Sequence, residues 1–221
     1  MAEQQAVQAA IAEQHLVMGY EEFLALPDDL HAEWVNGEVT IFMPPTTLHQ
    51  RLVSFLAKIL GLYAQALRLG EVLVAPCEMR LAHSAREPDL LFVATENLGR
   101  ISPQRIEGPA DLVIELISPE SVARDRADKF YEYQEAGVRE YWIIDPRPGK
   151  ERVDWYALAA DQTFLSIVPD AAGRYVSQVL PGFWLRPQWL WRVTLPAPVT
   201  VIKAVNPQAW EIITTSDDPT L

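Results

Sequence analysis

The sequence predicts a mixed α/β protein with a central β-sheet flanked by helices. Apolar residues recur at helical spacing between Thr47 and Leu69, which predicts a long helix. The run 110–117 is almost continuously apolar, as expected for a strand buried on both faces. With the polar helix after it and the strand 140–145, this run predicts a βαβ unit, right-handed if its strands are parallel in one sheet.

Turn and cap residues place the other elements. Residues 20–26 predict a short helix, and Asn36-Gly37 is a strong hairpin signal between two apolar-containing runs. Thr46 or Thr47 can cap the long helix and Gly70 can end it. The remaining strands are expected near 31–35, 38–43, 71–75, 78–82, 88–94, 152–158 and 163–168.

The length of 221 residues suits one substantial core. We expect a loose or helical N-terminal extension over 1–19, one domain over 20–195 and a Pro-containing, then polar tail over 196–221. No apolar stretch reaches the roughly 20 residues of a membrane span, and the N-terminus lacks the basic start of a secretory signal. The single cysteine, Cys77, excludes an internal disulfide framework and a Cys-based zinc cluster, and it fits a reducing cytoplasm.

The net charge of −12 makes tight, non-specific DNA binding unfavourable. The acidic residues are unevenly placed, however. Residues 1–38 hold eight carboxylates and residues 211–221 hold three, with no Lys or Arg in either segment. Residues 39–210 are therefore near neutral, and 46–70 carries three basic residues and no acid. The charge balance therefore does not exclude an anionic substrate.

Two carboxylates lie on predicted strands. The sequence has no GxGxxG, GxxxxGK[ST], GxSxG, HExxH or CxxC motif, which argues against P-loop and zinc chemistry. Asp89 follows Pro88 at the start of one strand, and Glu115 lies inside the most apolar run. A buried Glu115 needs a cation, hydrogen bonds or a raised pKa, and strand alternation places Val113 and Ile117 on its face. Two such carboxylates on neighbouring strands could hold Mg²⁺, whereas a structural pairing of Glu115 with Arg or Lys is equally compatible.

A basic residue, Lys129, lies in the helix after Glu115. Its spacing from Asp125 is i,i+4, which favours a solvated ion pair. The alternative is that Lys129 lies on the helix face over the sheet, with its ammonium group reaching the carboxylates.

Several segments together resemble the PD-(D/E)XK nuclease superfamily, and more closely the Uma-two family of restriction endonuclease-like proteins. These segments are PDLLFV (88–93), DLVIELISPES (111–121), ARDRADKFYEYQEAGVREYWIIDP (123–146) and, upstream, EWVNGEV (33–39) with MPP (43–45) and His49. The likeness covers roughly 20–195, and the combination of motifs is far more specific than any one of them.

The resemblance implies a restriction-endonuclease-like core, with Asp89 and Glu115 as ligands of Mg²⁺ (or Mn²⁺) and a basic residue that assists attack on the phosphate. The superfamily pattern expects Lys two residues after Glu115, where this chain has Ile117. In similar families the basic residue has moved to the following helix, and Lys129 matches that position.

Four further residues are accessory candidates, each with a structural alternative. Glu38 could add a carboxylate or be an exposed strand residue, and Glu78 could face the site or form a sheet salt bridge. His49 could touch a phosphate, although a hydrogen bond at the helix start is favoured. Tyr133, four residues after Lys129, more often packs and orients its neighbours.

Two functions of different classes remain. One is a Mg²⁺-dependent endodeoxyribonuclease acting through metal-activated water, with DNA as its substrate. The other is a catalytically inactive nuclease-like fold that serves as a dimerising or regulatory module, which the acidic balance and Ile117 favour. A hydrolase using Ser118 and His49 lacks a nucleophile elbow. An edge strand or the Trp-rich 182–192 region could form a homodimer interface, and no membrane association is expected.

Overall fold

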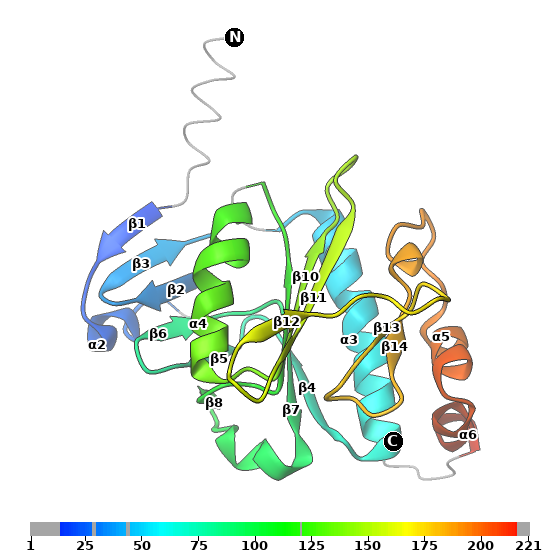
Figure 1. The fold of residues 1–221 in the computed structure, drawn as a ribbon. Coiled ribbons are helices and arrows are strands. Elements are labelled where there is room, and N and C mark those ends of the chain that lie inside the picture. Colours follow the sequence, from blue (N-terminus) through cyan, green and yellow to red (C-terminus); the bar gives the residue numbers. More distant parts are fainter. Residues whose placement is uncertain (1–13, 28–29, 43–44, 120, 216–221) are drawn as a thin grey trace.

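The computed structural model describes residues 14–27, 30–42, 45–119 and 121–215. Two six-stranded sheets and a two-stranded ribbon form its β-structure (Figure 1). The central sheet has the order β12 (Phe164–Ser166), β11 (Arg152–Leu158), β10 (Glu140–Asp145), β9 (Leu112–Leu116), β7 (Leu90–Ala94) and β4 (Gly70–Val74). The side sheet has the order β1 (Gln14–Val17), β3 (Glu38–Ile41), β2 (Ala32–Val35), β6 (Ser84–Arg86), β5 (Glu78–Arg80) and β8 (Arg105–Glu107).

The mixed α/β class and the central sheet are confirmed. Strands β9 and β10 pair in parallel and the other pairs of the central sheet are antiparallel, so the sheet is mixed. The connection between β9 and β10 contains a π-helical turn (Arg124–Asp128) and α4 (Lys129–Ala136), which confirms the βαβ unit. The ribbon pairs β13 (Tyr175–Val176) with β14 (Trp184–Leu185).

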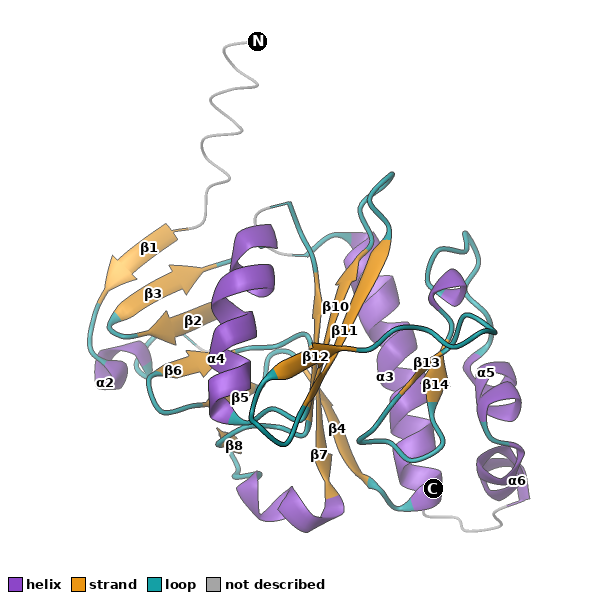
Figure 2. Cartoon of the chain, viewed as in Figure 1, coloured by secondary structure: helices purple, strands orange, loops and turns teal. Residues whose placement is uncertain are grey.

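Helices cover both faces of the central sheet (Figure 2). On one face, α3 (Thr47–Leu67) packs against alternate residues of β9, namely Leu112, Ile114 and Leu116. On the other face, Val113 and Ile117 pack with Tyr133 of α4. Because Met79 of the side sheet belongs to this second cluster, α4 lies over both sheets. No helix within the described ranges is both long and apolar enough to span a membrane.

The end of α3 differs from the prediction. Arg68, with φ of 54°, ends the helix in the left-handed conformation, and its N–H bonds to Ala64 O and Gln65 O. Gly70 is instead the first residue of β4, where a Cβ would lie 2.0 Å from Val93 O. Glycine is therefore required there by the close approach of β7, not by the helix end.

Other elements were missed by the sequence patterns. Residues 14–17 form β1, which pairs with β3, and β6 and β8 complete the side sheet. Residues expected as a tail form α5 (Pro198–Val205) and α6 (Pro207–Thr215), which bury Val201, Ile202 and Ala209 in the α3 core. The domain boundaries at 19 and 195 stay predictions.

The remaining helical elements are short. They are α2 (Tyr20–Phe23) and the 3-10 turns Thr95–Arg100 and Pro187–Trp189.

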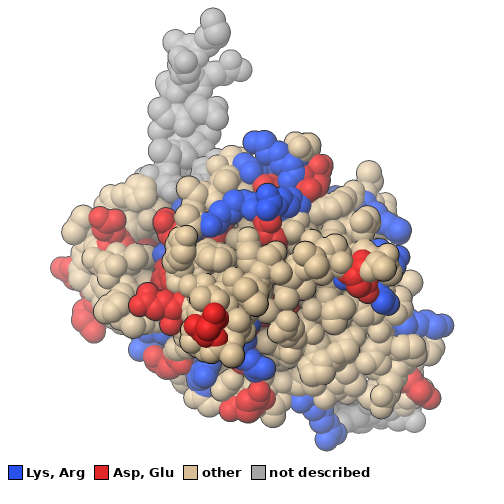
Figure 3. All heavy atoms as spheres, viewed as in Figure 1, with Lys and Arg blue, Asp and Glu red and all other residues tan. Residues whose placement is uncertain are grey.

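Charges are unevenly distributed over the surface. In Figure 3, acidic side chains are prominent over the side sheet, and basic side chains gather toward the upper centre and right of the view.

Candidate functional site

Asp89, Glu115, Lys129 and His49 line one cleft of about 1040 Å³. The start of α3 supplies His49, and the entry to β7 supplies Asp89. The turn between β10 and β11 contributes Arg147 to another wall. The three predicted catalytic positions, which lie between residues 89 and 129 of the sequence, therefore line the same cleft.

Glu115 is a buried carboxylate held by two side chains of α4. Its Oε1 accepts a hydrogen bond of 2.7 Å from Lys129 Nζ and one of 3.0 Å from the Tyr133 hydroxyl. The predicted face is confirmed, since Val113 and Ile117 pack beside Tyr133. The contact meets the expectation that a buried Glu needs a cation, and it brings Lys129 to the carboxylate as the resemblance implies.

A π-helical turn sets the position of Lys129. The Lys129 N–H bonds to Arg124 O, five residues earlier, and the Tyr141 hydroxyl donates to Asp125 O over 2.9 Å. The inserted residue changes the helical register just before α4, a deviation that is frequent at functional sites. Asp125 and Lys129 do form an ion pair, at 3.5 Å, but their side chains are only 2% and 4% exposed. The prediction of a solvated pair is wrong because the helix packs this face onto the sheets.

Lys129 is surrounded by carboxylates. Besides Glu115, its Nζ lies 2.9 Å from Glu33 Oε1 on β2. Burial by itself would lower the pKa of Lys129, but Glu115, Glu33 and Asp125 outweigh it and raise that pKa, so the ammonium group stays charged. Glu33 also binds Arg86 at 3.0 Å. Burial opposes its ionisation, yet Lys129 and Arg86 lower the pKa of Glu33 to about 2.

The pKa of Glu115 moves in the opposite direction. Burial raises it to about 8, against the attraction of Lys129, and the neighbouring charges of Asp125, Asp89 and Glu33 add to the rise. One ammonium group thus serves several carboxylates. A further cation in the cleft would favour the ionised form of Glu115.

Asp89 is held by the backbone of the neighbouring strand and by His49. Its Oδ2 accepts a 2.7 Å hydrogen bond from Leu116 N and lies 3.1 Å from His49 Nε2. The helix-start bond favoured for His49 is also present, because its backbone N–H donates to Thr46 Oγ1. His49 Nδ1 is buried and has no hydrogen-bond partner within the described part of the chain.

The donor set fits a hard divalent cation. In Asp89 and in Glu115, one carboxylate oxygen is anchored by protein donors, and the described residues place no donor on the other oxygen. No group of three or more His, Cys, Asp or Glu side chains in the described ranges is arranged to hold a metal. Mg²⁺ suits such a two-carboxylate site, because it usually keeps several waters and takes oxygens from a substrate phosphate.

The accessory candidates divide into two groups. Tyr133 and His49 contact Glu115 and Asp89 respectively. Glu38 is an exposed residue of β3 outside the cleft lining. Glu78, also outside it, accepts a 2.6 Å hydrogen bond from the Tyr20 hydroxyl and lies 3.8 Å from Arg105. Glu38 is thus the exposed strand residue, and Glu78 the salt-bridge partner, that the structural alternatives described.

Sequence reasoning missed Glu33 and Arg86 and treated Asp125 only as a helix partner. Glu33 reaches Lys129 because β2 of the side sheet lies against α4, a juxtaposition without a local pattern. The only available signal was an acid within the short, partly apolar strand 31–35. Ser118, the alternative nucleophile, accepts a hydrogen bond from Ser121 N, as expected for a turn residue.

Comparisons with known proteins agree with the fold. A solved structure of a "putative nuclease belonging to DUF820 from Anabaena variabilis ATCC 29413" is 18% identical, with a TM-score of 0.62, and the match covers 77% of this chain and 96% of that chain. Among curated proteins the comparison finds no match. The family model described as "Uma2: Putative restriction endonuclease" matches residues 20–188. The chain therefore belongs to the Uma2 family.

Proposed function

We propose that this chain is a metal-dependent endonuclease that hydrolyses DNA phosphodiester bonds, with Asp89 and Glu115 as ligands of Mg²⁺ or Mn²⁺. One observation carries the proposal: two carboxylates in one cleft each have one oxygen anchored by the protein and another to which the described residues give no donor. Membership of a family described as restriction endonuclease-like supports nuclease chemistry at the family level.

The metal, when bound, would lower the pKa of a water molecule and offset charge on the attacked phosphate. The residues of the chain prepare the ligands. Lys129 and Tyr133 fix Glu115 Oε1, and the Lys129 charge favours the ionised carboxylate. Leu116 N and His49 fix Asp89 Oδ2. Ile117 is buried in the core, so Lys129 supplies from α4 the basic group that the superfamily pattern places on the strand.

The second candidate is a nuclease-like module without catalysis that acts through dimerisation or regulation. It is favoured by the engagement of Lys129 with Glu115, Glu33 and Asp125, which occupies its ammonium group. A homodimer is compatible with both functions, and a cytoplasmic location fits the single cysteine.

The two functions are separated by calorimetric titration with Mg²⁺ and Mn²⁺, followed by nicking of supercoiled plasmid. Wild type, Glu115→Gln and Glu38→Gln are compared, because the second variant removes the same charge from an exposed site outside the cleft. We expect wild type and Glu38→Gln to bind metal and nick, and Glu115→Gln to lose both. Absence of metal binding in wild type would contradict the nuclease and favour the module.

A further inference from the structure

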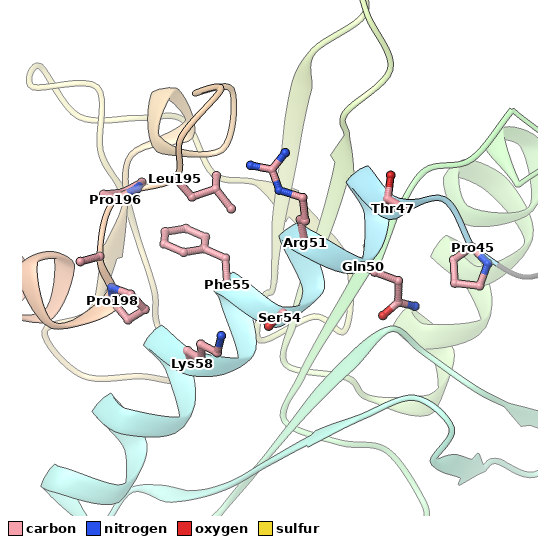
Figure 4. Close-up of a pocket in the computed structure, with 11 residues that line it drawn as sticks. Pro45, Thr47, Gln50, Arg51, Ser54, Phe55, Lys58, Leu195, Pro196 and Pro198 are labelled. Carbon is pink, nitrogen blue, oxygen red and sulfur yellow. The ribbon is translucent and has the colours of Figure 1, made fainter.

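A second hollow, of about 680 Å³, adjoins the cleft. Figure 4 shows it between α3 and the segment 195–198 that leads into α5. Pro45, Gln50, Ser54 and Lys58 line both the hollow and the cleft. The two depressions are therefore neighbours that share one edge.

That edge is a ridge of α3. Gln50, Ser54 and Lys58 are spaced four residues apart, so they lie on one face of the helix, and all three are exposed. From Gln50 to Lys58 the ridge spans roughly 12 Å along the helix axis. It runs along the shared edge, away from the start of the helix.

The ridge carries a lysine that is suited to contact a phosphate. Lys58 forms no salt bridge with any described residue, and 46–70 contains no acid. Arg51 also lines the hollow, and it joins α3 to the opposite wall through a 2.8 Å hydrogen bond to Val193 O. The wall formed by Leu195, Pro196 and Pro198 is apolar, which suits the sugars and bases of a strand whose phosphates face the lysine.

We infer that the Gln50–Ser54–Lys58 ridge and the adjoining hollow bind the backbone of the DNA strand where it leaves the cleft, with Lys58 contacting a phosphate. The inference rests on the proposed function, since the strand is the one cut in the cleft. Charge complementarity and continuity with the cleft favour this occupant over a peptide. The protein then places a basic side chain beside the strand despite a net charge of −12.

The test is fluorescence anisotropy of a labelled DNA duplex and of the matching single strand, in EDTA so that no metal-dependent cleavage occurs. Wild type, Lys58→Ala and Lys203→Ala are compared between about 50 and 200 mM salt. Lys203, on α5 outside both depressions, is the matched control because its loss changes the net charge equally. Ser54→Glu adds a carboxylate to the ridge, and thermal unfolding verifies that each variant is folded.

We expect Lys58→Ala to weaken binding at every salt concentration and to reduce the slope of log K against log salt by about 0.7 to 0.9, the loss of one phosphate contact. Ser54→Glu should weaken binding further, and Lys203→Ala should match wild type.

Equal affinity and slope for Lys58→Ala and Lys203→Ala would overturn the inference even if wild type nicks plasmid. Wild type that binds no DNA would overturn it as well. Lys58-dependent binding by a protein that never cleaves with Mg²⁺ or Mn²⁺ would support the ridge and contradict the nuclease.

Discussion

Glu115 and Glu140 are two buried glutamates on adjacent parallel strands, but they differ in the donors that surround their carboxylates. Burial raises the pKa of both, against hydrogen bonds or charges that oppose the rise. Glu140 Oε1 accepts from the indoles of Trp142 and Trp155, and its Oε2 accepts from Ser177 Oγ and two backbone N–H groups. Both of its oxygens are thus occupied by neutral donors.

Glu115 has a charged donor and an oxygen to which the described residues give none. It lines the cleft, whereas Glu140 lies outside the cleft lining at the other end of the β9–β10 pair. Burial alone therefore does not identify a functional carboxylate. What distinguishes Glu115 from an equally buried structural acid is an oxygen, beside a cleft, to which the described residues give no donor.

The largest effect is expected from removing the cation that Glu115 has and that Glu140 lacks among the described residues. Lys129→Met keeps the side-chain length but leaves Glu115, Glu33 and Asp125 without their shared ammonium group. We expect a loss of about 3 to 5 kcal/mol in the free energy of unfolding, measured with urea. The double variant with Glu115→Gln should recover part of that loss. A loss below about 1 kcal/mol would contradict a buried charge network.

Exchange of each glutamate for glutamine should separate catalysis from stability. In Glu115→Gln, the amide nitrogen can take the place of the oxygen to which the described residues give no donor. The fold should therefore persist while nicking falls at least about 100-fold. In Glu140→Gln, the amide must meet N–H or O–H donors in either orientation, which should cost about 2 to 3 kcal/mol of stability.

Plasmid nicking and urea unfolding of both glutamine variants test this contrast. Glu140→Gln should nick at the wild-type rate at temperatures where it is folded. The comparison fails if both variants lose activity while fully folded, or if both keep it.

Tyr133→Phe tests the neutral donor to Glu115. It removes one hydroxyl from the 3.0 Å contact with Oε1 and leaves Lys129 in place. We expect a stability loss of about 1 kcal/mol and a decrease in cleavage rate of about tenfold. The split between kcat and KM distinguishes positioning of the ligand from loss of substrate binding, because a positioning role lowers kcat with little change in KM.

The smallest effect on stability is expected at Asp145, the last residue of β10. Hydrogen bonds from Arg147 outweigh the opposing effect of burial and lower the pKa of Asp145 below the usual 3.8. Because the folded pKa lies below the unfolded one, the stabilisation is present above pH 3.8 and is lost as the pH falls through the folded pKa. Unfolding of wild type and Asp145→Asn should therefore differ at pH 7 and converge below pH 3.8. A difference that grows on acidification would show the opposite shift.

Local pattern predicted much of the fold. The hairpin at Asn36-Gly37, the long helix α3 and the buried strand β9 depend on turn chemistry and periodicity, and all three are confirmed. Strands β6 and β8 were missed because each has three residues with a single apolar side chain, whereas the equally short β5 and β12 lie within longer apolar-containing runs. Helices α5 and α6 begin at Pro198 and Pro207, residues that suit the first helical turn but are also common in loops.

Composition and periodicity predicted the α/β class and a polar residue inside the most apolar strand, and the resemblance added Asp89, Glu115 and Lys129 as site candidates. Long-range packing brings Glu33 to the ammonium group of Lys129, buries the Asp125–Lys129 pair that the i,i+4 spacing predicted, and places His49 against Asp89. Strand alternation and helix period act over a few residues and follow from backbone geometry. The shared ammonium group depends on a π-helical turn and on two sheets meeting across α4, arrangements that long-range packing creates and no local spacing encodes.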